Sequence, residues 1–275
     1  MARTTRYYRS RHPFMWLFAV AASLIILAPL TVLVFWCFAQ AWPAPELMPD
    51  SWGLGNIETV LNIEPELAKV VLESIALSLI VAAICVIVGL LVSHSLAYYE
   101  FKGKHLIDFL TFLPIIIPTT AFGMGAHVFL LRNGLAGNVT GVILVHVVVS
   151  IPYVIKILTD SLRMMGRSLA EQAWLFGASP LRAFIDVALP SLLPSIIAAF
   201  SLAFISSYGQ YFLTLIIGGS RVETLAVAMF PWITSAERGV SAVFAVIYLM
   251  SSLLIFLLLE LAEKLVSKNQ KNFLM

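Results

Sequence analysis

The sequence predicts an all-α integral membrane protein with six transmembrane helices and a cytoplasmic loop of two short helices. Three observations support this prediction. Of the 275 residues, 60% are hydrophobic and only 12% are charged, whereas soluble domains carry about a quarter charged residues. The apolar residues gather in six segments, each near the roughly 20 residues that a helix needs to cross a bilayer. A polar-edged stretch with helix start and stop signals separates the fourth segment from the fifth.

The six segments are divided by Pro, Gly, Asn or charged residues, and we expect them to form one transmembrane domain over residues 1–275. The expected spans are about 14–40, 70–97, 106–131, 141–161, 195–217 and 239–262. The first span follows several arginines, as a signal peptide would, and residues 39–41 resemble a cleavage site. Its apolar run is much longer than the roughly 7–15 residues of a signal-peptide core, so we interpret it as a retained helix.

Basic residues predict the orientation, because Lys and Arg gather in cytoplasmic loops. Most lie at the N-terminus, in the loops near 98–105 and 160–194, and in the C-terminal tail. These residues are Arg3, Arg6, Arg9, Arg11, Lys102, Lys104, Arg163, Arg167, Arg182, Lys264, Lys268 and Lys271. The alternate loops hold Lys69, Arg132, Arg221 and Arg238. Both termini and the loop between the fourth and fifth spans are therefore expected in the cytoplasm.

That loop, residues 163–194, carries its own helix signals. Ser168 and Glu171 form Ser-x-x-Glu, a capping box that starts a helix. Gly177 can take the left-handed conformation that ends this helix, and Ser179 can cap a second one. We therefore expect two short helices at an angle, joined by a glycine, at the membrane surface.

Pro190 and Pro194 are expected to end the second of these helices and to begin the fifth span. The residues alone leave two interpretations of the loop open. It is either a docking site for a partner or an amphipathic surface hairpin that only connects two spans.

The same loop resembles the EAA loop of binding-protein-dependent ABC importer permeases. The family pattern is Glu-Ala-Ala, three residues, Gly, nine residues, Ile, one residue and Leu-Pro. The positions that match in register are Glu171, Ala173, Gly177, Leu189 and Pro190. Gln172 replaces an Ala of the pattern and Val187 replaces the Ile, and both departures are mild. The resemblance implies that an ATPase subunit grips this loop.

The resemblance extends over most of the chain and indicates a type I permease of the group that serves polyamine, iron, thiamine and similar small solutes. The stretch from Ser207 to Tyr211, followed by Gly218-Gly219 and Thr224-Leu225, resembles that group. It implies a transport subunit in a bacterial cell (inner) membrane that works by alternating access. The implied partners are two ATPases, a second permease that is often a different chain, an external solute-binding protein and membrane lipid.

Several kinds of chemistry are missing from the sequence. It has no Gly-x-x-x-x-Gly-Lys-Ser/Thr phosphate loop, so ATP hydrolysis is expected on a partner chain and not on this one. We expect neither a cofactor nor a metal, and a net charge of +2 is too small to indicate nucleic acid. Cys37 and Cys85 lie in apolar runs and are expected to pack as small residues.

The fifth span is the most polar one. Ser206 and Gln210 share one helix face, and Ser207, Tyr211 and Thr214 form a stripe beside it. Small polar residues of this kind either join helices in lipid or line a passage, and both interpretations stay open. The resemblance implies that the equivalent helix lines the passage between two permeases.

Thr119 and Tyr153 lie at a similar depth and are further candidates for the lining. His127 and His146 either serve a proton path or bond neighbouring helices as neutral imidazoles. No Asp or Glu is expected near the midplane, which favours a neutral, anionic or zwitterionic solute over a polyamine.

Two alternatives to an importer subunit remain, an ion-driven secondary transporter and a membrane scaffold without transport. Prolines within the third and fourth spans predict kinks that fit the former, but a carboxylate near the midplane that would couple ions is missing.

Overall fold

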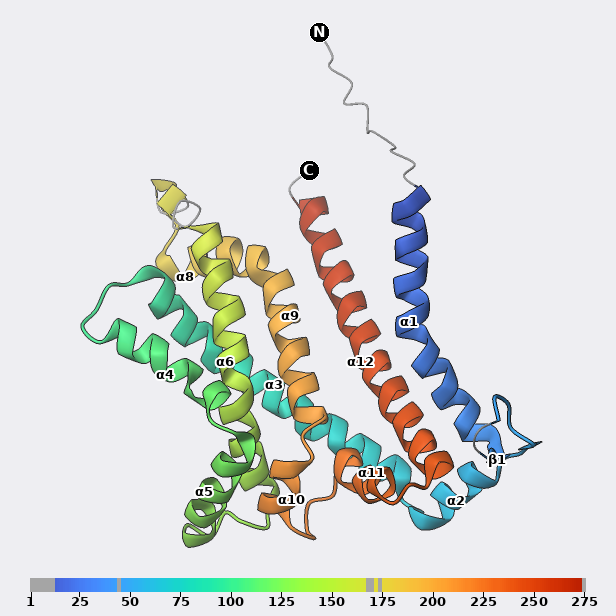
Figure 1. Ribbon diagram of the computed structural model, residues 1–275. Helices are drawn as coiled ribbons and strands as arrows, with labels where there is room; N and C mark the ends of the chain where they lie inside the picture. Colours follow the sequence, from blue (N-terminus) through green and yellow to red (C-terminus); the bar gives the residue numbers. More distant parts are fainter. Residues whose placement is uncertain (1–12, 44–45, 167–170, 173–174, 274–275) are drawn as a thin grey trace.

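The computed structural model describes residues 13–43, 46–166, 171–172 and 175–273 of the chain. The long helices are α1 (Pro13–Phe38), α3 (Leu67–Tyr98), α4 (Lys104–Ile116), α5 (Thr119–Arg132), α6 (Val139–Met165), α9 (Leu189–Tyr208) and α12 (Arg238–Phe273). The shorter elements are β1 (Ala39–Ala41), β2 (Ser51–Trp52), α2 (Gly55–Ile63), α8 (Pro180–Ala183), the π-helix η1 (Phe184–Ala188), α10 (Phe212–Gly218) and α11 (Leu225–Thr234). The antiparallel pair β1–β2 lies with α2 and α11 at one end of the molecule, and α8 lies at the other (Figure 1).

Five helical segments in the described part of the chain are long and apolar enough to cross a membrane. They are Trp16–Phe38, Leu67–Tyr98, Val139–Met165, Phe184–Tyr208 and Arg238–Ala262. The bent pair α4 and α5 makes a sixth if the two helices count as one span. The expected all-α membrane fold is thereby confirmed.

The third expected span, 106–131, is not one continuous helix. It consists of α4 and α5, which are bent by 102°. Between them Ile117 has an extended backbone, with φ −76° and ψ 128°. The cause is Pro118, because the residue before a proline is pushed out of the helical region.

The fifth expected span, 195–217, differs at both ends. The helix α9 begins at Leu189 and stops at Tyr208, and α10 begins only at Phe212. Gly209 at this break lies close to α12, since a Cβ there would be 2.8 Å from the Tyr248 hydroxyl. A glycine within an apolar run does not by itself predict a helix break, because the break depends on contacts with other helices.

The prediction that Pro190 and Pro194 end the second loop helix is wrong. The chain continues from α8 through η1 directly into α9, with Pro190 in the first turn of α9 and Pro194 inside it. Proline lacks the N–H that would bond one turn back. The wider π-turn that precedes Pro190 changes this bonding pattern locally, so the helix can pass the proline without stopping.

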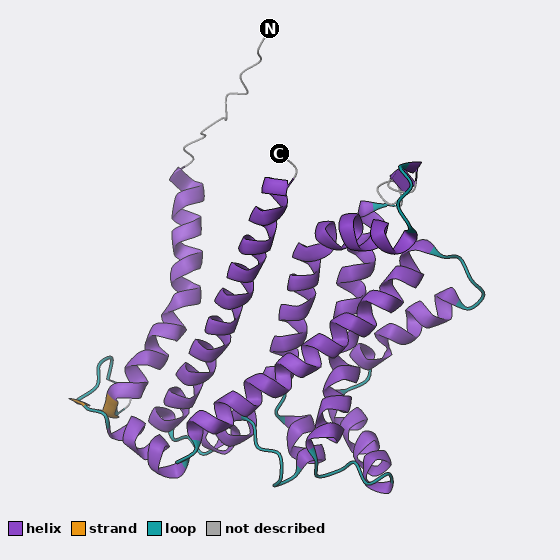
Figure 2. Cartoon of the chain, turned by 180° about the vertical axis from the view of Figure 1, so that it is seen from behind, coloured by secondary structure: helices purple, strands orange, loops and turns teal. Residues whose placement is uncertain are grey.

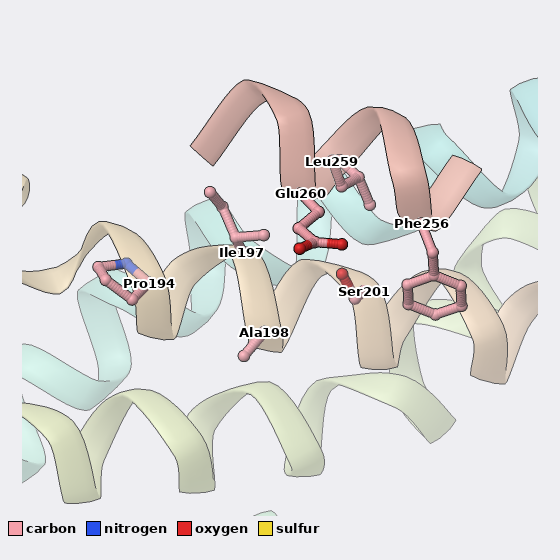
Figure 3. Close-up of a pocket in the computed structure, with 7 residues that line it drawn as sticks. All are labelled: Pro194, Ile197, Ala198, Ser201, Phe256, Leu259 and Glu260. Atoms are coloured by element: carbon pink, nitrogen blue, oxygen red, sulfur yellow. The ribbon is translucent and has the colours of Figure 1, made fainter. Parts of the chain in front are cut away.

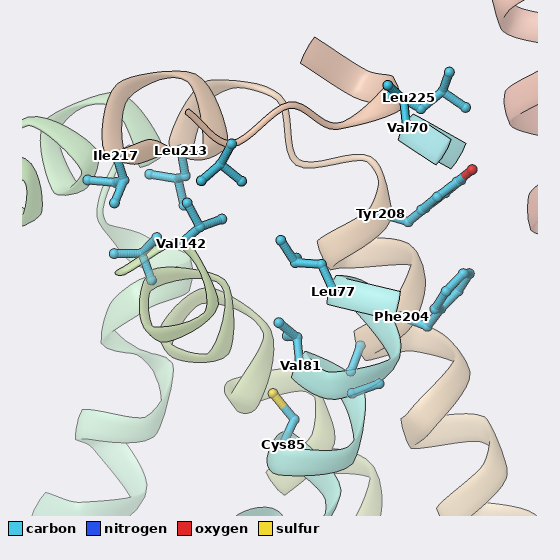
Figure 4. Packing of buried hydrophobic residues seen from close by; sticks show 14 of the residues in the cluster. Val70, Leu77, Val81, Cys85, Val142, Phe204, Tyr208, Leu213, Ile217 and Leu225 are labelled. Atoms are coloured by element: carbon cyan, nitrogen blue, oxygen red, sulfur yellow. The ribbon is translucent and has the colours of Figure 1, made fainter. Parts of the chain in front are cut away.

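The core forms where α3, α6 and α9 pack against one another (Figure 4). Gly89 lets α3 approach α6 closely, because a Cβ there would lie 2.6 Å from Cγ1 of Val154. Cys85 points into the same core as a free thiol, and Cys37 is likewise buried and free. Their position within the packing agrees with the role expected for both.

A separate contact joins α1 to α12 through α2. The Asn56 amide donates to the carbonyls of Trp36 at 3.1 Å and Ala39 at 2.9 Å, so it caps the end of α1. A Cβ at Gly239 would lie 2.4 Å from this amide, so only glycine lets α12 start beside it. The Arg238 guanidinium also lies 5.3 Å from the Trp36 ring. From this junction the two helices separate toward the other end of the molecule (Figure 2).

The start of α1, the end of α12 and α8 lie at the same end of the molecule, opposite β1 and the strand β2 that pairs with it (Figure 1). We therefore predict that cysteines introduced at Ser51 and Ser267, in a chain lacking Cys37 and Cys85, are labelled from opposite sides of the membrane. The basic loops favour the cytoplasm for Ser267. A membrane-impermeant thiol reagent on intact cells should label only Ser51→Cys, and labelling of both would contradict the six-span arrangement.

Candidate functional site

The loop between α6 and α9 carries the first candidate site. It leaves α6 at Gly166, which has φ +69°, and turns again at Gly177, which has φ +84°. The left-handed conformation expected at Gly177 is thereby confirmed. A Cβ at Gly177 would meet no atom within 4 Å, so the constraint there is backbone conformation and not space.

The second loop helix starts as expected. The Ser179 hydroxyl accepts a hydrogen bond from the backbone N–H of Arg182 at 3.4 Å, which caps α8. The expected capping box cannot be compared with the structure, since Ser168 lies outside the described residues, and so does Ala173.

The remaining EAA positions divide between the tip and the base of the loop. Glu171 and Gln172 are helical and exposed at the tip. Val187, Leu189 and Pro190 are half-buried at the base, where η1 joins α9.

Two large apolar side chains at the tip are exposed. Leu175 is 86% exposed and Phe176 is 91% exposed. Neither residue was among the site residues expected from the sequence. Large apolar side chains left in water at the tip of a polar-edged loop indicate a surface that a partner covers.

A charged contact lies on the same side of the molecule, in the turn between α3 and α4. The Lys104 ammonium is 2.7 Å from the Glu100 carboxylate. This hydrogen bond and charge hold the pKa of Glu100 below its usual value, and His105 and Arg163 lower it further. Arg163 belongs to the last turns of α6, so the turn and the start of the loop attract each other electrostatically.

The break in the fifth span is the second candidate site, and His146 of α6 bridges it. The ring Nδ1 lies 2.9 Å from the Ser207 hydroxyl on α9, and Nε2 lies 3.0 Å from the Thr214 hydroxyl on α10. The imidazole is only 1% exposed. One side chain of α6 therefore holds both halves of the broken span.

The hydrogen bonds also assign the tautomer of His146. The Thr214 hydroxyl donates to the carbonyl of Gln210, so it accepts from the imidazole. Nε2 then carries the proton, and Nδ1 accepts from the Ser207 hydroxyl. The geometry favours a neutral imidazole that bonds helices over a proton path. His127 differs, because its buried Nδ1 has no hydrogen-bond partner.

Four of the expected lining residues meet at the break. Ser206 accepts from the Ser150 hydroxyl at 3.0 Å, and Ser207 points into the core toward His146. Gln210 is half-buried within the break, and the Tyr211 ring stacks on Phe230 with centroids 3.6 Å apart. The other two candidates, Thr119 on α5 and Tyr153 on α6, lie on other helices and are exposed.

A hollow of about 280 Å³ lies between α9 and α12, away from the break (Figure 3). Its lining residues are Pro194, Ile197, Ala198, Ser201, Phe256, Leu259 and Glu260. The Glu260 carboxylate points toward Ser201 in this view and pairs with Lys264 at 2.6 Å. The hollow contains none of the residues expected to line the passage.

Residues 85–268 match the sequence model of a family described as binding-protein-dependent transport system inner membrane component. The chain belongs to this family. It therefore acts as a permease subunit of an ABC importer and is not an enzyme, and ATP is hydrolysed by a partner ATPase. The match begins within α3 and extends over the region of the EAA-like loop, and the expected family is thereby confirmed.

Curated relatives agree with this assignment. The chain is 30% identical to a probable sulfate transport system permease protein CysT of Prototheca wickerhamii, over 67% of this chain and 79% of the relative. It is 26% identical to the sulfate transport system permease protein CysT of Salmonella typhimurium, over 84% of each chain. Its fold is similar to a bacterial ABC transporter involved in the import of the acidic polysaccharide alginate, with a TM-score of 0.62 and 16% identity. That match covers 94% of this chain and 99% of the other.

Replacing His146 by Leu should destabilise the protein by about 1–3 kcal/mol, because the buried Ser207 and Thr214 hydroxyls lose their imidazole partner. His127→Leu is the matched control and should cost less, since a buried nitrogen without a partner is removed. Thermal unfolding of both variants in detergent measures the difference. Equal melting temperatures would show that the bridge contributes nothing.

Proposed function

We propose that this permease imports a small oxyanion, and that sulfate is its solute. The observation that carries the proposal is the similarity to sulfate permeases over 84% of both chains. The residues at the break support it, because Ser206, Gln210 and Tyr211 offer hydroxyl and amide donors and no carboxylate. A dianion in a low-dielectric passage needs such donors and is repelled by acidic groups.

The EAA-like loop is proposed as the contact with the ATPase. Glu171 and Gln172 would face the ATPase beside the exposed Leu175 and Phe176, while Gly177 sets the angle of the tip. Ala173 completes the motif, and Val187, Leu189 and Pro190 would transmit movement into α9. An exposed apolar tip flanked by polar residues suits a groove on a soluble partner.

The proposed assembly contains two ATPases, a second permease of different sequence and an external solute-binding protein. In this proposal the chain lies in a bacterial inner membrane with both termini in the cytoplasm, because the basic loops favour that side. ATP-driven closure of the ATPases would move the loop. The broken fifth span, together with Thr119 and Tyr153, would then line a passage that opens to alternate sides.

Uptake of labelled sulfate into proteoliposomes should require ATP and all the partners, and the purified chain alone should hydrolyse no ATP. Replacing Gln210 and Tyr211 together by Ala should lower uptake about tenfold, since donors at the break are lost. Thr234→Ala is the control, because this exposed hydroxyl bonds only within α11, to the carbonyls of Pro231 and Phe230.

Two results would contradict the proposed function. Uptake driven by an ion gradient without ATP would favour a secondary transporter. Preference for a polyamine over sulfate would reject the oxyanion, and unchanged uptake in the double variant would remove Gln210 and Tyr211 from the lining.

Gly177→Val should weaken ATPase association, because a β-branched residue in the left-handed conformation costs about 1–2 kcal/mol or more and shifts the tip. Gly103→Val is the matched control. Gly103 lies in the turn between α3 and α4 and has φ +90°, and a Cβ added there would meet no atom within 4 Å. Glu171→Lys should act like Gly177→Val by reversing the charge at the tip.

The measurement is paired, with membrane abundance beside ATPase co-purification. Both glycine variants should reach similar abundance, and only Gly177→Val should lose the ATPase. If Gly103→Val loses it equally, or if Gly177→Val keeps it, the loop does not dock the ATPase through this turn.

A further inference from the structure

The start of the EAA-like loop is fixed by the last residue of α3. The Tyr98 hydroxyl donates to the carbonyls of Leu162 at 3.2 Å and Gly166 at 3.1 Å. Leu162 lies in the last turn of α6, and Gly166 is the residue at which α6 ends. A single hydroxyl therefore holds the point where the loop leaves the membrane helices.

The end of the loop meets the same part of α3. The His94 ring, one turn before Tyr98, lies edge to face with the Tyr98 ring at a centroid distance of 5.2 Å. The His94 ring also lies edge to face with the Phe184 ring, at a centroid distance of 6.1 Å. Phe184 is the first residue of η1, where the loop returns toward α9. Edge-to-face contacts of this kind fix ring orientation as well as distance.

The backbone near each of these contacts departs from regular α-helix. Gly166 has a positive φ, and η1 is a π-helix, an irregularity that often marks functional sites. Ala183 precedes η1 and Ala188 is its last residue, and both are buried, so this irregular turn is packed against the rest of the protein. The loop thus has one irregular joint at its start and another at its end.

The helix that touches both joints is firmly connected to the core. The Ser93 hydroxyl of α3 donates to the carbonyl of Ile155 on α6 at 3.0 Å. At the other end of α3, the Ser74 hydroxyl accepts from the N–H of Leu225 at 2.8 Å, which caps α11. The helix has 32 residues, so it spans about 48 Å between the two faces of the molecule.

We propose that Tyr98, His94 and Phe184 form a clamp that holds the two ends of the EAA-like loop together on α3. Movement of the tip then displaces the cytoplasmic end of α3 together with α6 and α9. These three are positioning residues, because they lie at the base of the loop. Substituting them does not alter the exposed side chains of Leu175 and Phe176 at the tip. The clamp rests on the proposed docking of the ATPase to that tip.

The test uses the complete importer, with ATPase, second permease and binding protein, in proteoliposomes. ATP hydrolysis and sulfate uptake are measured in the same sample, and their ratio does not depend on how much complex is assembled. Tyr98→Phe removes the hydroxyl and keeps the ring. Tyr208→Phe is the matched control, because it also removes a hydroxyl that is bonded between helices, at 2.7 Å from Ser251, but far from the loop.

Tyr98→Phe should retain the ATPase on purification and lower uptake per ATP severalfold, whereas Tyr208→Phe should leave this ratio at the wild-type value. Phe184→Leu should lower the ratio of uptake to ATP hydrolysis in the same way. It replaces Tyr98→Phe as the test variant if Tyr98→Phe does not accumulate in the membrane. The double variant Tyr98→Phe with Phe184→Leu should lose less than the product of the single effects, because both residues belong to one clamp.

If the ratio of uptake to ATP hydrolysis stays at the wild-type value in both the Tyr98→Phe and the Tyr208→Phe complexes, the clamp is overturned. Independent, multiplicative effects of the two clamp variants would overturn it as well. A wild-type chain that does not retain the ATPase would instead contradict the docking role of the loop, so the two failures are distinguishable.

Discussion

A helix that breaks inside a bilayer must satisfy its freed backbone and polar side chains within the protein, since no water is there to do so. The fifth span breaks between Tyr208 and Phe212, and His146 supplies the bridge across the gap. With one nitrogen accepting and the other donating, the imidazole matches two hydroxyls of different polarity. The position of Gln210 and Tyr211 relative to α6 depends on this bridge.

The same constraint explains why hydroxyl groups recur at the helix contacts. Ser150 bonds Ser206, Ser161 bonds Ser195 at 2.8 Å, and Ser93 bonds a carbonyl of α6. These bonds follow α6 along its contacts with α9 and α3. Together with the close approach at Gly89, they make α6 the common neighbour of both helices. The EAA-like loop follows directly on this helix in the chain, after Gly166.

Local features of the structure followed from the sequence, and features that depend on distant contacts did not. The apolar runs predicted the spans, and Gly177 and Ser179 predicted a turn and a cap, because each signal acts within a few residues. The break at Gly209 depends on His146, which is far away in the sequence. The prediction that Pro190 ends the second loop helix would hold for an ordinary α-helix, and it is wrong here because a π-turn precedes the proline. The exposure of Leu175 and Phe176 could not be distinguished from burial, because apolar residues look alike in a sequence.

The way α1 is attached has a consequence for how the protein is made. Its most apolar stretch contributes nothing to the buried interior, and its contact through Asn56 and Trp36 lies at one end only. Such a helix is stable in lipid before any neighbour exists. The helices α6 and α9 carry His146 and Ser207, which lipid leaves unsatisfied until the two meet. We therefore expect α1 to insert as an independent anchor during biosynthesis, and the polar spans to become stable in the bilayer only as a group.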